Sequence, residues 1–185
     1  MSKMTKTNYF VLTGAMGGGK STLLREIRKA GIRGVAEPAR EILAEQRASA
    51  ADGVPEQNAA LFCKRMLSRS IENYNQAINA AEVQVFDRGI PDMIAYAELG
   101  SIDATPFSTA AEQNRYNPMV FFFAGWEEIY TNDAERKISF AGASLSGERV
   151  RVIYQKLGYQ LVNVPLQSIE ERTNFILERL LDAKQ

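Results

Sequence analysis

The chain of 185 residues carries 22 basic and 22 acidic side chains and contains no histidine. Its length is typical of one domain, and its apolar fraction of 45% is sufficient for a sizeable core without disulfides or metals. A net charge of zero argues against a nucleic acid or an anionic membrane as partner, because no excess of positive charge is available to attract phosphates. Without histidine, and with Cys63 as the single cysteine, Ser-His-Asp and Cys-His catalysis and ordinary structural zinc sites are excluded.

No targeting or membrane-spanning segment is predicted. The apolar runs at 9–12 and 119–125 are much shorter than the ~20 residues that a membrane helix needs, and neither has the length of a signal-peptide core. A single cysteine cannot form an intrachain disulfide, which is compatible with a reducing compartment. We therefore expect a cytoplasmic protein.

Short apolar runs alternate with longer segments of helical periodicity. In chain order the sequence predicts a strand at Tyr9–Thr13, a helix at Ser21–Ala30, a strand at Gly34–Ala36 and helices at Pro38–Ser49 and Pro55–Ala81. A strand at Val83–Phe86, a helix at Pro91–Leu99 and a strand at Met119–Ala124 follow. The remainder is predicted as a helix at Glu127–Ile138, a looser stretch at Ser139–Gly147, a helix at Glu148–Leu157, a strand at Gln160–Val164 and a last helix after Ser168. Apolar runs without alternation suit strands buried on both faces. Strands alternating with helices indicate right-handed crossovers and a doubly wound α/β sheet in one domain.

The segment Gly14-Ala15-Met16-Gly17-Gly18-Gly19-Lys20-Ser21 matches the phosphate-binding pattern G-x-x-x-x-G-K-[ST]. It follows a predicted strand and opens a predicted helix, which is the structural context that this P-loop motif requires. Its glycines allow successive backbone N–H groups to surround phosphate oxygens, and the start of the helix adds its positive dipole end.

The side chains at the end of this motif have distinct expected roles. Lys20 can reach the β- and γ-phosphates of ATP, and Ser21 supplies a hydroxyl to Mg²⁺. Thr22 offers a second hydroxyl, suited to an α-phosphate. We therefore expect ATP and Mg²⁺ as cofactors, with residues 14–22 as the nucleotide-binding segment.

Other motifs separate the classes of P-loop protein. A GTPase needs Asp-x-x-Gly after its third strand and Asn/Thr-Lys-x-Asp later, whereas this chain has Asp87-Arg88-Gly89 and nowhere contains the second motif. Leu145-Ser146-Gly147-Glu148 resembles a transporter-ATPase signature, but the strand that follows does not end in Asp-Glu. A kinase-like arrangement remains.

Three side chains at predicted strand ends are candidates for this chemistry, because ligands of open α/β sheets bind beyond the carboxyl ends of the strands. Glu37 can orient or deprotonate an acceptor hydroxyl. Asp87 can hold Mg²⁺, directly or through water, or bind a substrate hydroxyl, and Arg88 can bind a phosphate bidentately. The structural alternatives are that Glu37 caps the next helix and that Asp87 and Arg88 form a structural pair.

Arg136 is the further candidate, on the helix predicted after the fourth strand. An arginine there can stabilise the charge of the transferred phosphoryl group, with Lys137 and Arg149 behind it. The alternative is a solvated helix face with an ion pair between Asp133 and Lys137.

Taken together, these motifs resemble the family of P-loop ATPase/kinase domains that includes the ribosylnicotinamide kinase domain of bacterial NAD-biosynthesis regulators, and more distantly deoxynucleoside and thymidylate kinases. The matching segments are 14–22, Glu37-Pro-Ala-Arg40, Phe86-Asp-Arg-Gly89 with Asp92 and Tyr96, 126–130 running into 133–136, and Gly158-Tyr159…Val164-Pro165 before Glu171-Arg172. The resemblance implies a three-layer α/β/α fold whose five-stranded parallel sheet has the order 2-3-1-4-5. It also implies a helical lid at about 126–151 and a small acceptor beneath that lid.

Several side chains are weaker candidates. Arg65 and Arg69, and likewise Asp92 and Tyr96, are four residues apart on predicted helices, so each pair can line an acceptor pocket or form salt bridges and core contacts. Cys63 is interpreted as a small core residue, and Trp126 as packing at the end of the fourth strand.

The sequence therefore predicts ATP-dependent phosphoryl transfer to a small hydroxylated metabolite, with a nucleoside-like compound as the favoured acceptor. The alternative is a P-loop ATPase or nucleotide-dependent switch that acts on a partner protein.

Overall fold

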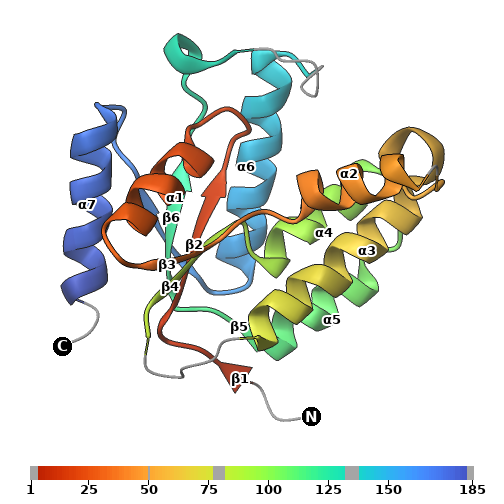
Figure 1. Cartoon of the computed structure of the whole chain (residues 1–185), viewed down its shortest axis with the longest axis horizontal. Helices are drawn as coiled ribbons and strands as arrows, with labels where there is room; N and C mark the ends of the chain where they lie inside the picture. Colours follow the sequence, from red (N-terminus) through yellow and green to blue (C-terminus); the bar gives the residue numbers. More distant parts are fainter. Residues whose placement is uncertain (1–3, 50, 77–81, 132–137, 183–185) are drawn as a thin grey trace.

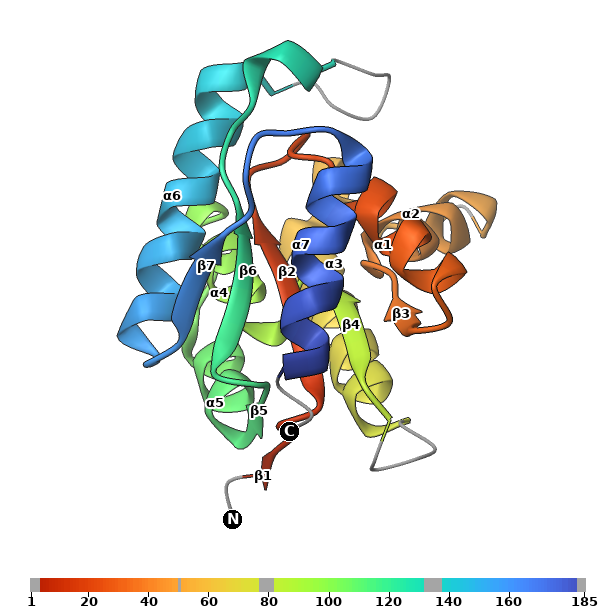
Figure 2. The same cartoon turned by 90° about the vertical axis from the view of Figure 1, so that its left-hand side faces the viewer.

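Five parallel strands form the central sheet of the protein (Figures 1 and 2). They are β2 (Tyr9–Gly14), β3 (Arg33–Val35), β4 (Gln84–Asp87), β6 (Met119–Phe123) and β7 (Gln160–Asn163), in the order β3-β4-β2-β6-β7. Counted along the chain, this order is 2-3-1-4-5, as expected. The computed structural model describes residues 4–49, 51–76, 82–131 and 138–182.

Helices cover both faces of this sheet (Figure 2). They are α1 (Lys20–Lys29), α2 (Ala39–Ala48), α3 (Pro55–Asn75), α4 (Ile90–Leu99), α5 (Thr105–Gln113), α6 (Phe140–Lys156) and α7 (Ile169–Asp182), with a short 3₁₀ helix, η1 (Glu127–Ile129). A separate two-stranded sheet pairs β1 (Met4–Thr5) with β5 (Asn114–Arg115). None of the helices within the described ranges is long and apolar enough to cross a membrane.

The central strand β2 shows why its apolar run has no alternation. Phe10 and Leu12 pack on one face of the sheet, in the cluster that contains Ile27 of α1. Tyr9 and Val11 pack on the opposite face, in the cluster to which α3, α4 and α6 contribute. Successive side chains of a strand point to opposite faces, and each fully buried large apolar side chain stabilises the fold by about 1.5–3 kcal/mol. Both faces are therefore core, and the three-layer α/β/α prediction is confirmed.

The structure corrects the prediction for 139–147. This stretch, expected to be loose, forms the first half of α6, where the side chain of Ser139 accepts a hydrogen bond from the Gly142 N–H, 3.2 Å away, and caps the helix. The two glycines obscured the helical pattern, because glycine disfavours a helix interior. Gly147 is buried at the crossing of α6 and the P-loop, where a Cβ atom would lie 2.8 Å from the backbone nitrogen of Ala15.

Two other helix predictions differ from the structure, and one helix was not predicted. The helix expected at Glu127–Ile138 is a 3₁₀ turn at 127–129, and residues 132–137 lie outside the described ranges. The long helix from Pro55 ends at Asn75 instead of Ala81, and 77–81 are not described. The helix α5 was missed, although a proline in its first turn and the spacing of its buried side chains were signals for it.

We expect Gly147→Ala to lower stability although alanine favours a helix. The new Cβ would press on the backbone of Ala15, which cannot yield without moving the P-loop, so we expect a net loss of about 1–2 kcal/mol. Thermal unfolding measures it, with Ser146→Ala, the preceding position, as a control that should unfold at the same temperature or slightly higher. A midpoint raised by Gly147→Ala would contradict this packing.

Candidate active site

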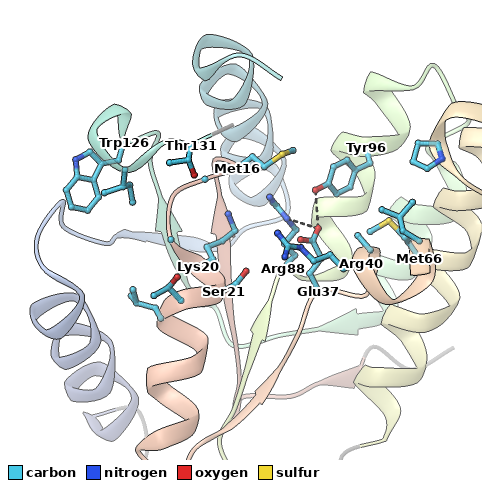
Figure 3. Close-up of a pocket in the computed structure, with 18 of the residues that line it drawn as sticks. Met16, Lys20, Ser21, Glu37, Arg40, Met66, Arg88, Tyr96, Trp126 and Thr131 are labelled. Carbon is cyan, nitrogen blue, oxygen red and sulfur yellow. Dashed lines mark hydrogen bonds and ion pairs between the residues drawn. The ribbon is translucent and has the colours of Figure 1, made fainter. Parts of the chain in front are cut away.

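A cavity of about 760 Å³ opens beyond the carboxyl ends of β2, β3 and β4 (Figure 3). One part, the P-loop half, is lined by residues 16–17, 19–23, Trp126, Ile129, Thr131, 167–169 and Arg172. The other part, the helical half, is lined by Ala39, Arg40, Leu43, Pro55, Ala59, Phe62, Cys63, Met66, Tyr96, Gly100 and Ile102. Glu37 and Arg88 also line the cavity. This volume lies within the range of small-molecule sites.

The P-loop turns sharply where β2 ends. Gly14 has φ +115°, and a Cβ atom there would overlap the carbonyl oxygen of Phe123 on the neighbouring strand β6. The backbone N–H of Ala15 donates to that same carbonyl at 2.8 Å. A residue with a side chain fits neither the backbone conformation nor the space, so this turn explains why the motif begins with glycine.

Lys20 is held inside the P-loop. Its side chain is buried, and Nζ donates to the carbonyl oxygen of Ala15 at 2.6 Å. Burial, followed by the positive charge of Arg88, lowers the pKa of Lys20 from 10.5 to about 8. Neutral carbonyl oxygens compensate a buried ammonium less well than an anion does, so the surroundings of Lys20 favour binding of a negatively charged group.

Ser21, which lines the cavity, contacts Asp87, which is buried behind it and is not among the lining residues. The hydroxyl of Ser21 donates to Oδ2 of Asp87 at 2.7 Å. The second carboxylate oxygen, Oδ1, is buried and has no hydrogen-bond partner within the described part of the chain. A hydroxyl beside a carboxylate that retains acceptor capacity is a donor set that suits Mg²⁺, which prefers oxygen ligands.

Glu37, Arg88 and Tyr96 form a polar group where the two halves meet (Figure 3). Arg88 Nε lies 3.0 Å from Oε1 of Glu37, and the Tyr96 hydroxyl donates to the same oxygen at 3.2 Å. The structure thus brings Glu37 and Arg88, predicted from separate strand ends, into contact. The α2 helix begins after Pro38 without a side-chain cap, so Glu37 does not play the capping role that was its alternative.

Arg172 was not recognised from the sequence as a site residue. It lies on α7, is buried, lines the P-loop half and donates to the carbonyl oxygen of Gly18 at 2.6 Å. Its guanidinium also lies over the rings of Phe123 and Trp126, at 5.2 and 5.3 Å from their centroids. An arginine at a position of α7 that faces the core was the available signal, since arginine is rarely buried without partners. Trp126, which Arg172 contacts, is also part of the cavity wall.

The weaker candidates divide into two groups. Tyr96 and Cys63 line the cavity, and burial raises the pKa of the Cys63 thiol, as expected for a core residue rather than a nucleophile. Asp92, for which pocket lining and core contacts were both open, is completely buried and does not line the cavity. Arg69 forms ion pairs with Glu41 and other acidic side chains.

One of the three basic residues proposed for the lid, Arg149, lies within the described residues. Arg149 lies on α6, with Nε 3.6 Å from Oε2 of Glu98 on α4. Arg136 and Lys137 lie outside the described residues. Their roles stay predictions.

Solved structures with the same fold include two that are named as kinases. The chain resembles the NadR protein solved in complex with NR, at 16% identity and a TM-score of 0.68, over 97% of this chain and 52% of that one. It resembles the deoxyadenosine kinase of M. mycoides, solved with dCMP and dCDP, at 18% identity and a TM-score of 0.68, over 94% of this chain and 99% of that one. It also resembles shikimate kinase from Acinetobacter baumannii, solved with shikimate, at 15% identity and a TM-score of 0.57, over 94% of this chain and 93% of that one.

These similarities concern the fold, since each identity is below a fifth. The chain spans about half the length of the NadR protein. No curated protein sequence matches it. The model of the AAA domain family matches residues 9–172, which include the P-loop, all five strands of the central sheet and Arg172, and the chain therefore belongs to that family.

Proposed function

We propose that the protein transfers a phosphoryl group from ATP to a small hydroxylated metabolite. The observation that carries this proposal is the continuity of the cavity, which joins the P-loop half to the largely apolar helical half. A second half of this kind provides room for an acceptor beside the nucleotide. The named kinases that share the fold support the same class of reaction.

The residues of the junction have complementary roles in this reaction. The acceptor hydroxyl attacks the γ-phosphorus, the bond from that phosphorus to the β,γ-bridging oxygen breaks, and ADP leaves. Glu37 accepts a hydrogen bond from the attacking hydroxyl, and takes its proton as the new P–O bond forms. Lys20 and the P-loop N–H groups stabilise the phosphate oxygens, and Arg88 supplies positive charge beside the acceptor.

Ser21 and Asp87 would hold Mg²⁺ beside the P-loop. Bound there, the ion would neutralise part of the negative charge of the β- and γ-phosphates. Arg136, predicted to meet the transferred phosphoryl group, and a lid over 126–151 complete the proposal from the sequence alone.

The lining of the helical half favours a nucleoside-like acceptor. Phe62 and Met66 on α3 and Leu43 on α2 offer an apolar environment for a planar ring. Glu37 and Tyr96 are available to sugar hydroxyls at the end nearest the P-loop. The acceptor hydroxyl is thereby directed towards the γ-phosphate.

Acceptor-dependent turnover is the first expected result. ADP formation from ATP and Mg²⁺ should rise on addition of a hydroxylated acceptor, tested over nucleosides, nucleotides and vitamins one at a time. Lys20→Ala, which removes a charge from the phosphate site, should lower the rate by about 100-fold or more. ATP hydrolysis that is indifferent to every acceptor but stimulated by another protein would contradict the proposal and favour a nucleotide-dependent switch.

Glu37→Gln should lower acceptor-dependent turnover by about 100-fold or more while changing ATP affinity little. The amide keeps the shape of the side chain but cannot take the proton. Single-turnover phosphoryl transfer and thermal unfolding are measured on the same preparation. Glu41→Gln, an exposed position on α2 whose carboxylate pairs with Arg69, serves as the control and should retain its rate. An unchanged transfer rate with a lowered midpoint in Glu37→Gln would remove Glu37 from the mechanism.

ATP binding should take up a proton above pH 8. The Lys20 pKa of about 8 in the free protein rises when phosphates surround the ammonium, so the bound state holds more protons than the free state at pH 8–9. ATP affinity should therefore fall with rising pH in this range, by at most about tenfold per pH unit. Calorimetry in buffers of different ionisation enthalpy measures the uptake. The same uptake in Lys20→Ala would assign the proton to another group.

A further inference from the structure

Asp92 lies outside the cavity, in the first turn of α4, and has no exposed surface. Its carboxylate accepts four hydrogen bonds. Thr13 Oγ1 and Arg88 Nη1 donate to Oδ1, at 2.6 and 2.9 Å. The Gly89 backbone N–H and the Tyr154 hydroxyl donate to Oδ2, at 3.0 and 2.7 Å. A buried carboxylate with four donors is held firmly in one position.

Arg88 connects this buried carboxylate to the cavity. Its Nη1 binds Asp92 and also donates to the Gly14 carbonyl oxygen at 3.2 Å, while its Nε faces Glu37. The backbone of Arg88 has φ +68°, a conformation that few non-glycine residues adopt and that surrounding contacts must maintain. The guanidinium thus lies between one carboxylate that solvent cannot reach and one that lines the acceptor site.

We propose that Asp92 is a positioning residue for phosphoryl transfer, which acts through Arg88 to place Glu37 for the acceptor hydroxyl. This inference rests on the proposed kinase activity. Without the carboxylate of Asp92, the guanidinium loses its buried anionic partner and is drawn towards the carboxylates that remain, Glu37 and Asp87. Glu37 would then be engaged more tightly by Arg88 and displaced from the hydroxyl that it has to orient.

A purely structural role for Asp92 makes a different prediction. The same carboxylate joins β2, through Thr13, to α6, through Tyr154, so any substitution in this network should lower stability. Tyr154→Phe is the matched control, because it removes one buried donor to Asp92 but leaves the carboxylate and its contact with Arg88. A positioning role predicts that Asp92→Asn lowers turnover strongly, whereas Tyr154→Phe lowers stability and leaves turnover nearly unchanged. A purely structural role predicts that turnover and stability fall together in both variants.

The test compares Asp92→Asn, Tyr154→Phe, Arg88→Gln and the double variant Arg88→Gln/Asp92→Asn in the acceptor assay. We expect Asp92→Asn to lower kcat by about 10- to 100-fold, as for a displaced catalytic group, with the KM for ATP within about threefold of wild type. Tyr154→Phe should lower the thermal midpoint while kcat stays within about threefold. In the Arg88→Gln background, Asp92→Asn should cost no further activity, because Asp92 acts through the missing guanidinium.

The double variant also keeps the test decisive if Asp92→Asn alone does not fold. Arg88→Gln leaves a buried carboxylate without its cation, so adding Asp92→Asn should restore stability, and the two Arg88→Gln proteins can be compared. A further loss of kcat in the double variant, or an unchanged kcat in a folded Asp92→Asn, would overturn the positioning role while the kinase activity stands. A wild-type protein without acceptor-dependent turnover would instead overturn the proposed function, and this inference with it.

Discussion

A group of charged side chains gathered beneath the carboxyl ends of the strands constrains this structure more than any other feature. Lys20, Asp87, Arg88 and Asp92 are buried there, and Glu37 lies beside them at the cavity wall. Burying a charge is costly unless it is paired or hydrogen-bonded, so each of these groups needs its partners at close distance. These partners come from the P-loop, the ends of β3 and β4 and the start of α4, so these segments have to keep fixed positions relative to one another.

The order of the strands makes this arrangement possible. The P-loop follows β2 in the middle of the sheet, and Asp87 ends β4 beside it, so that Ser21 and Asp87 meet across adjacent strands. β3, next to β4, delivers Glu37 to the same edge. Parallel strands have all their carboxyl ends on one side, which is why ligands of such sheets bind there. Helices α2, α3 and α4 then enclose the helical half of the cavity.

The two halves of the cavity contribute differently to what the protein can bind. The P-loop half combines the backbone of the glycine-rich turn with Lys20 and Ser21, an arrangement suited to phosphate groups in general, and with the larger side chains of Trp126 and Arg172. The helical half is built mainly from side chains of three separate helices, α2, α3 and α4. Two of the solved structures that share the fold carry different names, a deoxyadenosine kinase and a shikimate kinase. Under the proposed function, the acceptor would be selected in the helical half.

The sequence by itself determined the α/β alternation, the five strands of the sheet and the P-loop, because these features are written in local patterns of glycine, apolar runs and turn residues. It also indicated Glu37, Asp87 and Arg88 from their positions at strand ends. Only the tertiary structure decided which side chains meet, because the partners of Arg88 and the Gly18 contact of Arg172 join residues up to 154 positions apart. It likewise decided that Asp92 is buried instead of facing the pocket, since helical spacing shows which residues share a face but not what that face packs against.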